Sequence, residues 1–247
     1  MATLELANKR VVYCKEEKEV KPESFGQIES PKAVRMSSPE PQKIYISYNN
    51  IHKLCQKGAK QIIGMGERPD LIIGISGGGL IPARIIRSCL KREGERSIPI
   101  QTIGLSLYED FGANGDVEKI GKTVTRTQWL DYNALKQHFN SLVGKKLLIV
   151  DECDDTRTTL HYAISELQRE VEQQQQEAGN KEDMGTTFTV FVLHNKLKPK
   201  KASLPASIMD TNHYIVGKDV PDEWLCYPWD ADDIEEHTRL AELQGNI

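Results

Sequence analysis

Short apolar runs that end in polar loops recur along the chain. Residues 147–150 are all apolar and lead straight into acids and hydroxyls, and residues 70–76 lead into three consecutive glycines. Apolar runs this short and rich in branched side chains are typical of strands buried inside a parallel sheet. After each loop, apolar residues at helical spacing predict a helix, marked by Leu160, Ala163, Ile164 and Leu167 in one case and Leu80, Ala83, Ile85 and Ile86 in the other. Strands alternating with helices predict an α/β fold, a parallel sheet flanked by helices.

The rest of the chain divides into a tail and a folded region. Residues 1–42 carry four prolines and little periodic pattern, so we expect a disordered N-terminal extension before a domain spanning 43–247. Residues 51–63 suit an amphipathic helix, and residues 100–107 and 190–196 suit strands. The polar segment 109–127 is too long for a plain turn. Residues 168–183 include four consecutive glutamines and are interpreted as a surface insertion that prolongs the preceding helix.

The composition limits the functional classes to which the protein can belong. The 247 residues carry a formal net charge of −4, which disfavours a general nucleic-acid binder. Five cysteines without paired spacing suggest neither a disulfide framework nor a zinc site, and therefore a reducing compartment. No segment reaches the length of a membrane span. We expect a cytoplasmic protein with no nucleic-acid or membrane partner.

The loop after residue 150 combines two kinds of ligand-binding group. The hydroxyls of Thr156, Thr158 and Thr159, with main-chain N–H groups at a helix start, suit a phosphate. Asp151 and Glu152 repel phosphate and fit sugar hydroxyls or a divalent cation instead. Arg157 either adds positive charge or points into solvent. The segment predicts a ligand that carries phosphate and ribose together.

The same loop resembles a known signature. Residues 150–159 are similar to the phosphoribosyl pyrophosphate (PRPP) motif of type I phosphoribosyltransferases, and the glycine loop resembles that family's pyrophosphate loop. Arg157 stands where many relatives have glycine; if the position needs a positive φ, arginine is strained there, and the alternative is a differently shaped loop. The resemblance implies the type I fold with a small hood built from both ends of the domain, and a homodimer or homotetramer. It also implies that PRPP is bound by Asp151, Glu152, Asp154, Asp155, Thr156, Arg157, Thr158, Thr159, Ser76, Gly77 and Gly78.

A C-terminal segment completes the resemblance. The pattern Trp-x-x-x-Pro-Trp-Asp at residues 224–230 is similar to the base-binding segment of bacterial xanthine-guanine phosphoribosyltransferases. By that resemblance Trp224 stacks on a purine, the Leu225 main chain meets its exocyclic edge, and Asp230 lies near pyrophosphate and Mg²⁺, for which Glu152 is the second candidate ligand. Lys196 would donate to the purine 6-oxo group, with Lys198 as its rival.

Together these matches imply transfer of the 5-phosphoribosyl group from PRPP to an oxopurine, which is hypoxanthine, guanine or xanthine. Asp155 is the expected general base, with Asp154 as the alternative. Relatives close a mobile loop over the reacting centre, which makes Ser106, Tyr108 and Arg126 lid candidates. A non-catalytic regulatory protein that senses PRPP is the alternative function, and a pyrimidine or adenine enzyme is disfavoured by the lysine and tryptophan.

Overall fold

A computed structural model describes residues 42–107, 124–179 and 185–247 of the chain. Residues 1–41 of the expected disordered extension 1–42 lie outside those ranges, as does the lid candidate Tyr108. Residues 41–247 form one compact unit. Within the described residues, no helix is both long and apolar enough to cross a bilayer.

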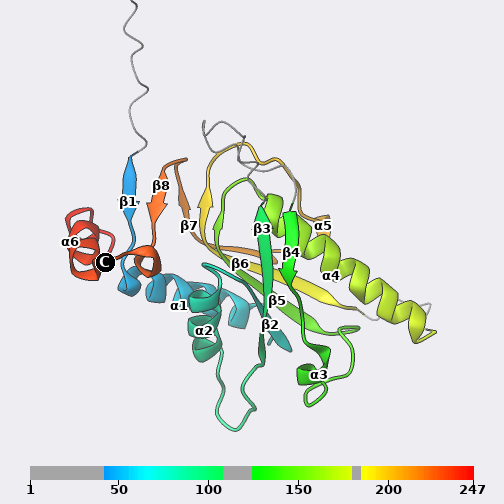
Figure 1. The fold of residues 1–247 in the computed structure, drawn as a ribbon. Helices are drawn as coiled ribbons and strands as arrows, with labels where there is room; N and C mark the ends of the chain where they lie inside the picture. Colours follow the sequence, from blue (N-terminus) through cyan, green and yellow to red (C-terminus); the bar gives the residue numbers. More distant parts are fainter. Residues whose placement is uncertain (1–41, 108–123, 180–184) are drawn as a thin grey trace, which may run out of the picture. The chain divides into compact units, whose positions relative to one another are not determined.

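A six-stranded sheet forms the centre of this unit (Figure 1). Its strands lie in the order β4-β3-β2-β5-β6-β7, and the five from β3 to β7 in that order are mutually parallel. β4 pairs antiparallel with β3 at one edge. The strands are β2 (Leu71–Ile75), β3 (Ile100–Leu107), β4 (Val124–Gln128), β5 (Lys146–Asp154), β6 (Thr187–Lys196) and β7 (Tyr214–Val220). The predicted parallel sheet is confirmed.

Helices cover both faces of the sheet, and the sheet divides the core into two apolar clusters. On β5, Leu147 and Ile149 belong to one apolar cluster and Leu148 and Val150 to the other, which is why the strand has no polar face. One cluster packs under α4 (Thr158–Glu177), α3 (Tyr132–Leu135) and α5 (Ala206–Met209). The other packs under α1 (Tyr48–Gly64) and α2 (Leu80–Cys89).

The two ends of the folded region meet in a small hood beside the sheet. β1 (Lys43–Tyr45) pairs in parallel with β8 (Trp224–Cys226), and Ile44 lies opposite Leu225. The 3₁₀ helix η1 (Pro228–Asp230) and α6 (Ile234–Leu243) follow β8. α6 is tied to the start of the domain by a 2.9 Å hydrogen bond between His237 Nε2 and the Ile46 carbonyl. This is the hood that the family resemblance implies.

Two details differ from the sequence interpretation. The end of the polar segment 109–127 forms β4, which was missed because its residues Val-Thr-Arg-Thr-Gln lack an apolar face. The glutamine-rich stretch is only partly a surface feature: Val171 is buried, and Gln174 Oε1 accepts hydrogen bonds from Ser141 Oγ at 2.9 Å and the Leu142 N–H at 2.8 Å. Its first half therefore belongs to the packed part of α4.

Candidate active site

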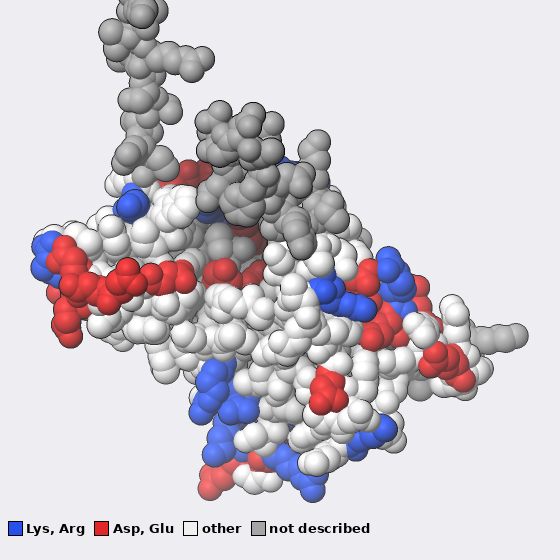
Figure 2. Space-filling model, viewed as in Figure 1, with Lys and Arg blue, Asp and Glu red and all other residues white. Residues whose placement is uncertain are grey.

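The predicted binding loops converge because parallel strands place their carboxyl ends on one edge of the sheet. β2 runs into the glycine loop, β5 into the acidic loop, and β6 ends at Lys196, and these three strands are neighbours in the order β2-β5-β6. The space-filling view shows acidic side chains in a hollow on this face of the molecule (Figure 2).

Two adjacent acids mark the end of β5. The Asp151 side chain is buried and accepts a 3.0 Å hydrogen bond from the Glu152 N–H. Burial, together with the neighbouring Glu152 carboxylate, raises the pKa of Asp151 well above its usual range. Among the described residues neither acid has an ion-pair partner. A buried carboxylate such as Asp151 without a cation is costly, so this pair suits a ligand that brings hydroxyls or positive charge.

The glycine loop lies directly against one of these acids. A Cβ atom on Gly78 would lie 2.1 Å from Cδ of Glu152, so the Glu152 carboxylate occupies the space that a side chain would fill. A Cβ on Gly79 would lie 2.5 Å from the main-chain oxygens of Ile75 and Val150, and Gly77 has a φ of +97°. Main-chain contacts favour glycine at position 79 and a positive φ favours it at position 77, while Gly78 brings the predicted pyrophosphate loop against the ribose acid Glu152.

The hydroxyl-rich loop opens α4, as predicted. Thr156 Oγ1 and Thr158 Oγ1 lie 2.9 Å apart, and the helix begins at Thr158. The first N–H groups of a 20-residue helix are free of intrahelical partners and favour an anion. This end of α4 has the character of a phosphate site.

Arg157 has the left-handed backbone conformation that favours glycine. Its φ is 68° and its ψ is 2°. The guanidinium does not point into solvent: Nε and Nη2 lie 2.9 and 2.8 Å from Asp154 Oδ2, and Cζ lies 4.9 Å from the centre of the Tyr214 ring. The Arg157 backbone thus has the positive φ at which arginine is strained, and its side chain is held by these contacts. Whether the loop is shaped as in relatives that carry glycine stays a prediction.

Asp154 is the centre of this arrangement. Its side chain is fully buried, and Tyr214 donates a hydrogen bond to the same oxygen that Arg157 contacts. Lys200 Nζ lies 3.6 Å from the other carboxylate oxygen and donates to the main-chain carbonyls of Asp154 and Asp155 at 2.6 and 3.0 Å. The sequence gives no sign of these roles for Tyr214 and Lys200, since both depend on contacts across the sheet.

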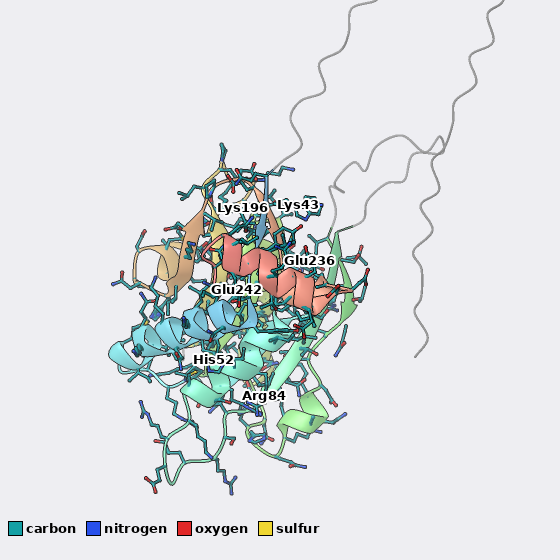
Figure 3. The ribbon with its side chains drawn as sticks, turned by 90° about the vertical axis from the view of Figure 1, so that its left-hand side faces the viewer. Lys43, His52, Arg84, Lys196, Glu236 and Glu242 are labelled. Carbon is teal, nitrogen blue, oxygen red and sulfur yellow. The ribbon has the colours of Figure 1, made fainter. Side chains whose placement is uncertain are left out.

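Asp155 has a different environment from its neighbour. Its carboxylate is 40% exposed and lies 2.6 Å from Lys198 Nζ and 3.6 Å from Lys196 Nζ. The same two ammonium groups lie 2.8 and 3.6 Å from Asp222 Oδ1. Lys196 lies at the same end of the molecule as Lys43 of β1 (Figure 3). Both rival lysines thus lie within reach of the expected general base.

The base-binding segment presents an exposed aromatic side chain beside a hollow. Trp224 is 60% exposed, although indole rings are usually covered. With Leu225 and Asp230 it lines a cavity of about 520 Å³. Tyr227 of the same segment is buried, also lines the cavity, and stacks on Trp229 with ring centres 4.7 Å apart and planes at 5°. An open aromatic face on a firmly packed support is suited to stacking on a flat ligand.

Comparison with known proteins decides the family. Residues 47–174 match the phosphoribosyl transferase domain. The chain belongs to the phosphoribosyltransferase family. Xanthine phosphoribosyltransferase 1 of Saccharomyces cerevisiae is 64% identical over 207 residues, which cover 84% of this chain and 99% of the yeast protein. The hypoxanthine-guanine phosphoribosyltransferase of Schizosaccharomyces pombe is 51% identical over 84% of this chain and 98% of its own length.

Solved structures agree with this fold. A hypothetical protein from Neisseria gonorrhoeae with bound ppGpp is 36% identical, with a TM-score of 0.63 over 84% of this phosphoribosyltransferase and 99% of that chain. The purine phosphoribosyltransferase of Pyrococcus horikoshii has a TM-score of 0.51 over 77% of this chain and 95% of its own, at 22% identity, and supports the fold alone.

The donor set of this phosphoribosyltransferase fits Mg²⁺ in the way the ion is usually held. The described residues contain no cluster of three or more metal-binding side chains. Mg²⁺ commonly takes one or two protein carboxylates and completes its shell with water and substrate phosphates. Glu152, without an ion-pair partner in the described part of the chain, and the exposed Asp230 suit that role.

Two lid candidates of the phosphoribosyltransferase lie on the paired strands β3 and β4. Ser106 is paired with Thr125, and Leu105 with Arg126. The Arg126 guanidinium lies 4.7 Å from the Trp129 ring centre and 3.9 Å from a Glu166 oxygen. In this structure the Arg126 guanidinium thus contacts Trp129 and Glu166 of α4. A lid role for Arg126 stays a prediction.

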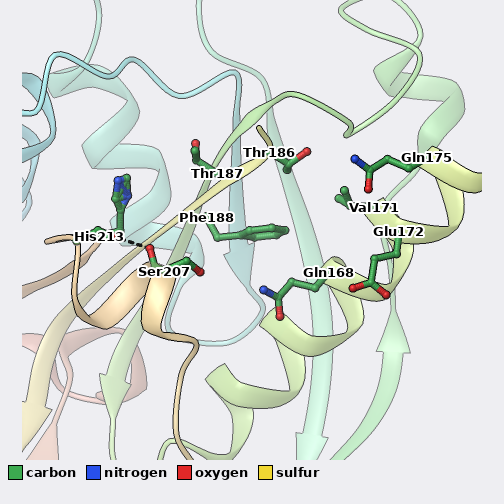
Figure 4. A pocket seen from close by; sticks show the side chains of 10 residues that line it. Gln168, Val171, Glu172, Gln175, Thr186, Thr187, Phe188, Ser207 and His213 are labelled. Atoms are coloured by element: carbon green, nitrogen blue, oxygen red, sulfur yellow. Dashed lines mark hydrogen bonds between the residues drawn. The ribbon is translucent and has the colours of Figure 1, made fainter. Parts of the chain in front are cut away.

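A separate cavity of about 470 Å³ lies at the other end of the sheet (Figure 4). It is lined by Thr187 and Phe188 at the start of β6 and by the second half of α4. Because β6 carries its site residue at its carboxyl end, this cavity is not part of the active site.

Proposed function

We propose that this phosphoribosyltransferase is a purine salvage enzyme that transfers the 5-phosphoribosyl group of PRPP to hypoxanthine, guanine or xanthine, forming the nucleoside monophosphate and pyrophosphate. The observation that carries the proposal is the meeting of three elements at one edge of the sheet. These are the acids beside Gly78, the hydroxyl-rich start of α4, and two lysines beside Asp155. The relatives named above act on oxopurines by their names and are 64% and 51% identical.

PRPP would extend across the three loops. Thr156, Thr158 and Thr159, with the first N–H groups of α4, would hold the 5-phosphate. Asp151 and Glu152 would accept hydrogen bonds from the ribose hydroxyls, and the main chain of the glycine loop would face pyrophosphate. When bound, Mg²⁺ would neutralise charge on the pyrophosphate.

Transfer requires one bond to break and one to form. The bond from ribose C1 to the pyrophosphate oxygen breaks and leaves its electron pair on pyrophosphate, while a purine ring nitrogen forms the new bond to C1. Positive charge on the ribose ring is stabilised by the nearby acids. Asp155 would accept the proton that the purine loses. Asp154 is unsuited to that task, because its carboxylate is buried and bonded to Arg157 and Tyr214.

Recognition of the base would combine stacking with one charged donor. Trp224 would stack on the ring, and Lys196, which ends β6, would donate to the 6-oxo group. An ammonium has donors and no acceptor, so it disfavours adenine, whose 6-amino group also donates. Xanthine comes first among the bases to test, since the relative named for it is 64% identical.

Asp155→Asn tests the chemical assignment. Loss of the general base should lower kcat for pyrophosphate release by about 100-fold or more, while the KM for PRPP stays within a factor of about three. Asp210→Asn is the matched control, because Asp210 is exposed and follows α5, away from the site. Equal losses in PRPP binding and turnover would instead give Asp155 a binding role.

A further inference from the structure

β5 extends beyond its neighbour at the point where Glu152 lies. The last β2–β5 pair is Gly74 with Val150, whereas β5 continues to Asp154. The Val150 carbonyl faces the β2 side, where Gly79 approaches it. Since carbonyl directions alternate along a strand, the Glu152 carbonyl faces the same side, past the end of β2. A partly buried main-chain carbonyl there needs a donor that the sheet does not supply.

The Tyr227 hydroxyl supplies that donor. It donates to the Glu152 carbonyl at 3.1 Å and lies 2.9 Å from Nδ1 of the fully buried His194 on β6. The Tyr227 hydroxyl carries its proton near pH 7, as an ordinary phenol does. Burial lowers the pKa of His194 to about 4, so the imidazole is neutral near pH 7 and carries one proton.

The direction of the Tyr227 hydrogen bond sets the position of the His194 proton. With the single Tyr227 hydroxyl proton given to the Glu152 carbonyl, the proton between the two side chains belongs to His194 Nδ1. His194 Nε2 then keeps a lone pair, in keeping with its lack of a hydrogen-bond partner in the described residues. The result is a directed chain from the β6 imidazole through the hood tyrosine to the main chain of β5.

We propose that Tyr227 and His194 are positioning residues that hold Glu152 for PRPP and connect the PRPP loop to the base-binding segment. Tyr227 lies between Leu225 of that segment and Trp229, on which its ring stacks. The Tyr227 side chain thus contacts both the main chain near the end of β5 and the Trp229 ring that follows β8. This inference rests on the proposed function, in which Glu152 meets ribose or its metal.

Tyr227→Phe tests the hydroxyl while keeping the stacked ring. It should raise the KM for PRPP by about 5- to 20-fold, the effect of one lost hydrogen bond that leaves a partly buried carbonyl unpaired, with the KM for the purine changed less than about 2-fold. Tyr48→Phe removes the same oxygen from an exposed ring that begins α1 and should change neither constant. An unchanged KM for PRPP in Tyr227→Phe would overturn the proposal.

Two substitutions of His194 separate hydrogen bonding from packing. His194→Asn keeps an N–H near the Nδ1 position and should leave the KM for PRPP within about 3-fold of wild type. His194→Leu fills the space without a donor and should raise it as Tyr227→Phe does, with no further rise in the double variant. Equal effects of asparagine and leucine would mean that His194 only packs, and would contradict the proposal.

The test is distinct from that of the function itself. If the wild-type protein transfers no phosphoribosyl group, the proposed function fails whatever the variants do. Calorimetric titration with Mg-PRPP would then still show whether Tyr227→Phe and His194→Leu weaken PRPP binding by the same 5- to 20-fold.

Discussion

Arg157→Gly would install the residue that many relatives carry at this place, and we expect it to destabilise the protein. A non-glycine residue at a φ of 68° costs about 1–2 kcal/mol, which glycine would recover. Against this, the substitution removes two hydrogen bonds to the fully buried Asp154 carboxylate and the contact with the Tyr214 ring.

Breaking a buried ion pair costs about 3–5 kcal/mol, because the remaining charge loses its partner. Glycine adds about 0.5–1 kcal/mol by widening the unfolded ensemble. Lys200, at 3.6 Å from the carboxylate, and the Tyr214 hydroxyl reduce the loss. A net destabilisation of about 1–3 kcal/mol follows from these opposing effects.

Urea unfolding followed by tryptophan fluorescence measures the difference, read from the midpoint at constant slope. Asn212→Gly is the matched control, since Asn212 also has a positive φ, of 60°, and its side chain is exposed. That variant should be as stable as wild type or more stable by up to about 1 kcal/mol. If Arg157→Gly were equally stable or gained stability, the guanidinium contacts would not be what holds the loop.

Four further predictions concern the glycine loop and the residues expected to bind the base. Gly79→Ala should destabilise the fold by about 3 kcal/mol or more in urea unfolding, because its Cβ meets two main-chain oxygens at 2.5 Å. Gly78→Ala meets only a flexible glutamate side chain, so stability should stay within about 1 kcal/mol while the KM for PRPP rises about 10-fold. Trp224→Ala should raise the KM of the purine about 10-fold in initial-rate assays, from a stacking contribution of about 1–3 kcal/mol, and leave that of PRPP unchanged. Between Lys196→Gln and Lys198→Gln, the former should relax discrimination against adenine more.

The parallel sheet and its loops follow from the sequence because buried parallel strands are continuous apolar runs. The same rule explains why the sequence does not predict β4, whose polar residues pair with β3 at the edge of the sheet. Hydrophobic pattern locates strands that are covered on both faces, and it says little about an edge strand.

The shape of the loop at Arg157 could not be read from its own residues. The positive φ is held by Asp154, which lies three residues away, and by Tyr214, which lies 60 residues from Asp154 in the sequence. Tyr227 and His194 are likewise 33 residues apart. The family motif identifies residues that meet substrate, whereas side chains that support them depend on tertiary contacts.

The most direct test of the central claim is the initial rate of nucleotide formation with xanthine, hypoxanthine, guanine and adenine, each with saturating Mg-PRPP. The account predicts turnover of at least one oxopurine with release of pyrophosphate, and no turnover of adenine. Tight binding of PRPP without turnover of any of the four bases would contradict it.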